Sequence, residues 1–143
     1  ITSMVQELVP GQLVVYLGDG QCWLLQCRDL NILWKNFPSS HSMEWKSLDV
    51  SVLHGSILEG MMQLPREALD RQEILRYTRD ASEACNAVDS GEGVLAFLLP
   101  APGVEAVGEV ALAGDVMPQK STYFYPKLLT GLVFADLAGS QSG

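Results

Sequence analysis

The sequence predicts an α/β domain with a mixed sheet, and three observations lead to that expectation. Near the N-terminus, two apolar runs flank a Gly-Asp-Gly turn, a pattern typical of a β-hairpin. Residues 48–62 carry apolar side chains at helical spacing. Over residues 74–99, a short apolar segment, a helical segment and a continuous apolar run follow one another, which predicts a βαβ unit. We therefore expect a hairpin, a crossover unit and about three helices packed on a sheet.

The predicted hairpin joins residues 13–17 to residues 22–27 through Gly18, Asp19 and Gly20. Glycine tolerates the positive φ angles that tight hairpin turns require, so this tripeptide is a strong turn signal. Residues 28–47 show no clear periodicity, and we expect a connecting loop there.

Three helices are predicted further along the chain. The first covers residues 48–62, where one apolar stripe is formed by Val50, Leu53, Ile57, Leu58 and Met61. The second begins at Asp80, which is placed to cap it, and ends before Gly91. The third runs from Pro102 to Gly114. The apolar run over residues 94–99 predicts a strand that is covered on both faces, and residues 132–134 predict a last strand.

Composition limits the classes of function. A chain of 143 residues is long enough for one core, so we expect a single domain over residues 1–138 and a disordered tail over residues 139–143. The net charge of −8 disfavours nucleic acid as a partner, because phosphate binding needs a basic surface. No apolar run approaches the roughly 20 residues that span a bilayer, so no membrane partner is expected.

The beginning of the chain and its cysteines bear on its context. The sequence opens on Ile1 rather than on a methionine and has no signal-peptide core, from which we expect a piece of a longer cytoplasmic protein. Cys22, Cys27 and Cys85 are an odd number of cysteines without metal-ligand spacing. We therefore expect reduced thiols and neither a disulfide framework nor a metal site.

The run from Met117 to Gly131 is the richest in residues that carry chemistry. Lys120, Ser121 and Thr122 follow a proline-containing turn, and Lys127 comes shortly after them. An ammonium group beside hydroxyls can hold a phosphate or a carboxylate through charge-assisted hydrogen bonds, so these four residues are candidates for anion binding. Alternatively, the lysines pair with neighbouring acids or lie at strand ends. The glycine spacing of a P-loop is absent.

Three further residues are weaker candidates. Tyr123 and Tyr125 would share one face of a strand, where they would stack on a base or pack against the core. His54 borders the apolar stripe of the first helix, and its charge can change near neutral pH. No catalytic set and no cofactor are implied by the residues present.

Four stretches resemble the C-terminal part of a bacterial and archaeal family catalogued as domain of unknown function 1015. They are residues 48–54, 74–84, 91–100 and 114–133, the last of which includes Met117-Pro118 and the run through Lys127 to Gly131. Full-length members carry, in an N-terminal half, an Ala-Asp-Gly-His-His-Arg type motif similar to the nucleotide-handling motif of partition-protein CTPases and free-serine kinases. That motif does not occur in these 143 residues.

The resemblance implies a fold and the location of a site, but no reaction. In one interpretation the chain is an accessory domain that contributes an anion-binding motif to a nucleotide-handling site, completed by the N-terminal half of the same protein. In the other it is a structural or protein-interaction domain, for example in a homo-oligomer, without chemistry of its own. Whether the protein is an enzyme stays open on the sequence.

Overall fold

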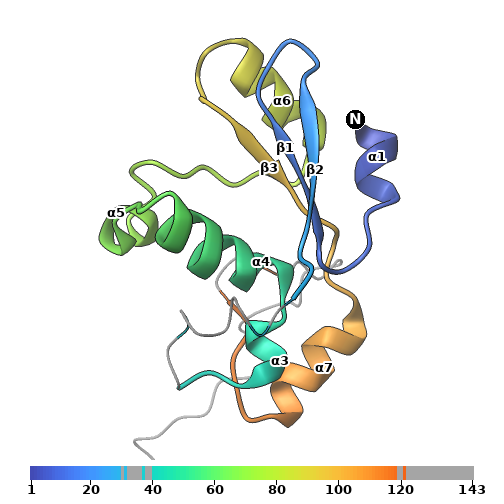
Figure 1. Ribbon diagram of the computed structural model, residues 1–143, viewed down its shortest axis with the longest axis vertical. Coiled ribbons are helices and arrows are strands. Elements are labelled where there is room, and N and C mark those ends of the chain that lie inside the picture. Colours follow the sequence, from blue (N-terminus) through green and yellow to red (C-terminus); the bar gives the residue numbers. More distant parts are fainter. Residues whose placement is uncertain (30, 32–36, 38–39, 119–120, 122–143) are drawn as a thin grey trace, which may run out of the picture.

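The computed structural model describes residues 1–29, 31, 37, 40–118 and 121, and Figure 1 shows their arrangement. Strands β1 (Gln12–Tyr16), β2 (Cys22–Gln26) and β3 (Ala96–Leu98) form an antiparallel sheet in the order β2-β1-β3. Helices pack around this sheet, so the α/β class is confirmed, and so is the N-terminal hairpin. The predicted strand at residues 132–134 and the tail at residues 139–143 lie outside the described residues.

The hairpin turn is fixed by a tyrosine that reaches a helix far along the chain. The hydroxyl of Tyr16 donates to the carboxylate of Asp89 at 2.8 Å and accepts from the amide of Gly20 at 3.0 Å. The amide of Asp19 donates to the same carboxylate at 3.0 Å. Because Gly18 and Gly20 have φ angles of +96° and +74°, the turn uses a backbone conformation that glycine adopts without strain.

One face of the sheet is covered by α6 (Ala81–Asp89) and α1 (Thr2–Gln6). Asp80 caps α6 as predicted, since its carboxylate accepts from the amides of Ser82 and Glu83. The alternation of β1 directs Val14 and Tyr16 to this face, where both are almost fully buried. We call this the α6 cluster, and its buried residues are Val14, Tyr16, Cys85 and Leu98.

The segment over residues 74–78 differs from its prediction. It is an extended stretch without strand partners, and β3 pairs with β1 in antiparallel fashion, so the described residues form no βαβ crossover and their sheet is antiparallel, not mixed. The physical reason lies in polar contacts to α6, which hold the segment away from the sheet and leave Ile74 and Tyr77 53% and 38% exposed. The polar side chains of Arg76 and Thr78 instead bind Glu83 of α6.

A second hydrophobic cluster lies against the opposite side of β3. Its helices are α4 (Asp49–Ser51), η1 (Val52–Met61) and α5 (Arg66–Asp70), which follow one another across the middle of Figure 1. The buried residues of this η1 cluster are Leu53, Leu58 and Leu69, with Phe97 and Leu99 packed against them. β3 therefore contributes to both clusters, because its residues alternate between the two faces of the sheet.

The predicted helix over residues 48–62 forms, but most of it has the wide π-helical turn. The amide of Met62 donates to the carbonyl of Ile57, five residues earlier, at 2.8 Å. Leu53 and Leu58, five residues apart, are the buried pair, whereas Met61 is 69% exposed. The apolar stripe expected from α-helical spacing is thus right for the leucines and wrong for Met61.

A short helix in the predicted loop over residues 28–47 ties the end of the domain together. α3 (Met43–Lys46) is capped by Ser42, whose hydroxyl accepts from the amide of Trp45. It packs against α7 (Val104–Leu112), which ends at Gly114 with φ of +74°. Among the helices of the described ranges, none combines the length and hydrophobicity needed to cross a bilayer.

Candidate functional site

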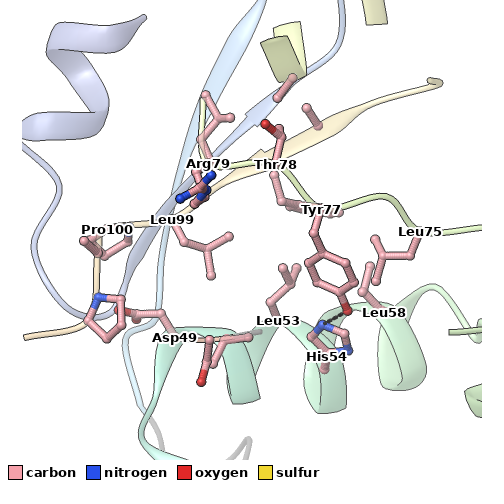
Figure 2. Close-up of a pocket in the computed structure, with 18 of the residues that line it drawn as sticks. Asp49, Leu53, His54, Leu58, Leu75, Tyr77, Thr78, Arg79, Leu99 and Pro100 are labelled. Carbon is pink, nitrogen blue, oxygen red and sulfur yellow. Dashed lines mark hydrogen bonds between the residues drawn. The ribbon is translucent and has the colours of Figure 1, made fainter. Parts of the chain in front are cut away.

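An open cleft of about 1550 Å³ is lined by residues of η1, of β3 and of the extended segment over residues 74–80. Figure 2 shows its interior, where leucines of η1 face leucines of the opposite wall. Small-molecule sites commonly measure about 300–1,000 Å³, so this cleft is large enough for a small ligand. The central apolar side chains are Leu53, Leu58, Leu75, Leu99 and Pro100.

His54 and Tyr77 meet across one end of this cleft. The hydroxyl of Tyr77 lies 3.1 Å from Nε2 of His54, and Figure 2 shows the tyrosine reaching down from the extended segment to η1. The two rings are nearly parallel, at an interplanar angle of 6°. This contact links the two walls of the cleft. It also joins the only histidine among the candidates to a tyrosine that sequence reasoning did not select.

Burial sets the protonation of both rings. Desolvation lowers the pKa of His54, although the carboxylates of Glu59 and Asp70 act in the opposite direction. Desolvation also raises the pKa of Tyr77. At neutral pH His54 is therefore an uncharged imidazole whose Nε2 can accept a hydrogen bond from the tyrosine hydroxyl.

Because the pKa of His54 is lowered, the free energy of unfolding should depend on pH, and this dependence can be measured. Below about pH 6.5 the unfolded chain binds a proton at this residue before the folded chain does, so the free energy of unfolding falls as the pH falls through that window. At higher pH, the contribution of His54 to the free energy of unfolding is constant. Urea denaturation at several pH values should show wild type losing stability toward acid relative to a His54→Gln variant. The comparison cancels contributions that the two proteins share, and parallel curves for the two proteins would contradict the prediction.

The opposite wall carries a network of charges around Arg76. Its guanidinium lies 2.6 Å from Glu83 and 3.2 Å from Glu92, and the hydroxyl of Thr78 donates to Glu83. The hydrogen bond from Thr78, followed by the one from Arg76, lowers the pKa of Glu83. Arg79, the next residue after Thr78, also lines the cleft and is labelled in Figure 2. These contacts hold the 74–80 segment against α6 without a sheet.

Asp49 anchors the other end of the cleft. Its carboxylate accepts from the amide of Gly11 at 2.7 Å, which fixes the start of α4 beside the start of β1. Burial raises the pKa of Asp49, and the bond from Gly11 partly offsets that effect. Because this oxygen already binds the backbone, Asp49 serves as a support of the cleft wall.

Most of the charged side chains that line the cleft are acidic. Arg76 and Arg79 are its two guanidinium groups, and eight carboxylates accompany them. An anion would therefore bind only where added positive charge outweighs the acids. The carboxylates belong to Glu44, Asp49, Glu73, Asp80, Glu83, Glu92, Glu105 and Glu109.

Of the four residues predicted for anion binding, the structure describes Ser121, and it lines this cleft. Its hydroxyl donates to the carbonyl of Pro118 at 2.6 Å, which closes a tight turn at the beginning of the motif. His54, a weaker candidate, lies at the same cleft. The remaining candidates, Lys120, Thr122, Tyr123, Tyr125 and Lys127, lie outside the described residues.

The approach to the motif is held by Asp115. Its carboxylate accepts from the amide of Ser42 at 2.8 Å and lies 3.2 Å from Nδ1 of His41. The bond from Ser42 is the largest cause that lowers the pKa of Asp115. The ring of His41 stacks on Trp45 at 3.9 Å. These contacts fix the segment that follows α7 to the beginning of α3, a few residues before Ser121.

Sequence reasoning missed Tyr77, Thr78 and Arg79, because the pattern over residues 74–78 predicts a strand of the sheet. The available signal was the polar run from Arg76 to Asp80, which is atypical of a buried strand. In the part of the chain that the structure describes, no three His, Cys, Asp or Glu side chains gather as a metal site would require.

Comparison of the chain with protein-family models, with curated proteins and with solved structures gives no match. The resemblance of residues 48–133 to an uncharacterised family stays a prediction from its motifs. A proposal of function therefore rests on the geometry of the cleft and on the residues that line it.

Proposed function

We propose that the chain is an accessory domain whose cleft forms one wall of a site for a small molecule with an apolar body and a phosphate or carboxylate group. The observation that carries the proposal is the position of Ser121. This residue of the anion-binding motif lines the same cleft as Thr78, Arg79 and the His54–Tyr77 pair. In the sequence, Ser121 is flanked by Lys120 and Thr122.

The residues that line the cleft suit both parts of such a ligand, the apolar body and the anionic group. Leu75, Leu99 and Pro100 line the cleft and are only half-buried, so they offer an apolar surface for the body of the ligand, as is usual in binding clefts. Arg79 and the motif lysines would supply the positive charge that the carboxylates of the cleft otherwise oppose. Charged donors form the stronger hydrogen bonds to phosphate and carboxylate oxygens.

In this proposal further polypeptide completes the site. The sequence resemblance points to the N-terminal half of a longer protein, which would bring nucleotide-handling residues to the opposite side of the cleft. The room in the cleft, beyond that of an ordinary small-molecule pocket, is consistent with such an arrangement. The free thiols of Cys22, Cys27 and Cys85 are in keeping with a cytoplasmic protein.

A titration followed by NMR tests the proposal on this chain. With added ATP, the amide signals of Thr78, Arg79 and Ser121 should shift and saturate. A Lys120→Ala variant should bind roughly tenfold more weakly or worse, because a hydrogen bond to a charged group contributes about 1.5–3 kcal/mol. An Arg71→Ala variant is the control, since Arg71 is exposed and does not line the cleft.

Two results would count against it. Equal affinity for ATP in wild type and Lys120→Ala would show that the motif is not part of the site. Shifts confined to residues away from the cleft would place the ligand elsewhere. Inorganic phosphate, titrated in parallel, separates recognition of the anionic group from recognition of the whole nucleotide.

The second candidate function, a protein-interaction domain, is favoured by a different observation. Strand β2 lies at the edge of the sheet and leaves three consecutive large apolar side chains in solvent, those of Trp23, Leu24 and Leu25.

A further inference from the structure

We propose that β2 pairs with β2 of a second copy of this chain, which joins two sheets into one across a two-fold axis at Leu24. The inference is independent of any ligand in the cleft. It starts from the exposure of β2: Trp23, Leu24 and Leu25 are 64%, 53% and 40% exposed, although they are consecutive residues of a strand. Both faces of this strand are thus apolar and open to solvent.

The backbone of β2 is open in the same place. Gly11 pairs with Cys27, and Leu17 with Gln21, through hydrogen bonds at the two ends of the hairpin. Since bonded pairs alternate in an antiparallel ladder, Trp23 and Leu25 bond to β1. The amide and carbonyl groups of Cys22, Leu24 and Gln26 therefore point away from β1, toward the free edge.

This edge lacks the usual protection against pairing. Natural edge strands commonly carry lysine, proline or a bulge, and β2 carries none of them among Cys22, Trp23, Leu24, Leu25 and Gln26. Helix α1 packs on the α6 side of the sheet through Val5, as does Leu8 just after it, and Met4 of α1 lies 4.0 Å from Cys22, sulfur to sulfur. α1 thus flanks the first residue of β2 on one face.

A second copy is the occupant that this strand fits, because the strand is complementary to itself. Antiparallel pairing centred on Leu24 sets Cys22 opposite Gln26 of the other copy, so all outward backbone groups find partners. Trp23 then lies opposite Leu25 in a non-bonded pair, in which side chains come closest. Aromatic–aliphatic pairs of this kind stabilise sheets.

The area covered when two β2 strands pair indicates the affinity expected for the dimer. Five paired residues with their flanking side chains cover on the order of 1,000 Å², the lower limit for a specific interface. We therefore expect reversible association in the micromolar range. The net charge of −8 on each copy opposes the approach, so added salt should strengthen the dimer.

Sedimentation velocity over a micromolar concentration series, with variants at Leu24, tests the proposal. Wild type should show a concentration-dependent dimer, whereas Leu24→Lys and Leu24→Glu should each be monomeric, because each places like charges opposite one another at the axis. Mixing the two variants should restore a dimer that contains one copy of each. Leu112→Lys, at a side chain that is 91% exposed on α7, is the control and should dimerise like wild type.

A cross-link checks the register. Leu24→Cys should give a disulfide-linked dimer on mild oxidation, since directly opposed residues of a bonded pair lie at a Cα separation that a disulfide can span. Circular dichroism shows whether the variants are folded, which is expected because Leu24 does not bond to β1. A monomeric wild type, a dimer that survives Leu24→Lys, or charge variants that stay apart when mixed would overturn the proposal.

Discussion

Replacing Leu58 with alanine is expected to lower the free energy of unfolding by about 2–5 kcal/mol, the range for truncating a buried leucine. Leu58 is 2% exposed and belongs to the η1 cluster, in which residues of η1, α5 and β3 pack together. The loss is a large part of the about 5–15 kcal/mol that separates folded from unfolded domains, so the variant should also be visibly less stable to heat.

Met61 provides the matched control for Leu58. It lies on the same helix but is 69% exposed, so Met61→Ala should change stability by no more than about 0.5 kcal/mol. Urea denaturation of both variants measures the difference. Equal effects at the two positions would mean that η1 buries a different face, for instance the one expected from α-helical spacing.

The second large effect is expected at Gly55, where alanine should destabilise the protein by about 1–3 kcal/mol through overpacking. A Cβ at this position would clash with Cε1 of Phe37 and would lie 2.9 Å from Cζ of the same ring. The ring would have to move, and its edge-on contact with Trp45, at 6.1 Å between centroids, would move with it. The gain of about 1 kcal/mol in helix propensity does not offset that disturbance fully.

Gly108 gives the opposite sign for the same substitution. It lies in α7 with no atom within 4 Å of an added Cβ, so Gly108→Ala should stabilise the protein by about 0.5–1 kcal/mol. Thermal and urea unfolding measure both variants. Removing the obstructing ring, in a Gly55→Ala, Phe37→Ala double variant, should cost less than the sum of the single changes. Additive effects would show that Phe37 is not the cause.

Local signals explain the parts of the fold that the sequence predicted well. The turn at Gly18-Asp19-Gly20 and the cap at Asp80 are both decided by residues within a few positions, and both are confirmed. The strand expected at residues 74–78 failed for a different reason. Arg76 and Thr78 bind Glu83 of α6, and these contacts hold the segment beside the helix and not beside β3. Partner choice is a non-local property that periodicity cannot show.

The site could be predicted only in part. His54 and Ser121 were selected from their residue types, and both line the cleft. Tyr77 was not, because its role comes from the hydrogen bond to a histidine 23 positions earlier. The buried face of η1 also differs from the predicted one, at Met61. The widened turn brings Leu53 and Leu58 into register, and no pattern in the sequence distinguishes that turn from an ordinary α-helix.

The strand order β2-β1-β3 also governs what happens while the chain is being made. The hairpin of β1 and β2 is complete by Gln26, but the partner of Val14 on the other side is Leu98. Ribosomes add about 5–20 residues per second, so the inner edge of β1 waits several seconds for β3 to emerge. During that interval the hairpin has two open edges instead of one. Until β3 emerges, the nascent hairpin is therefore more open to pairing with other strands than it is in the folded domain.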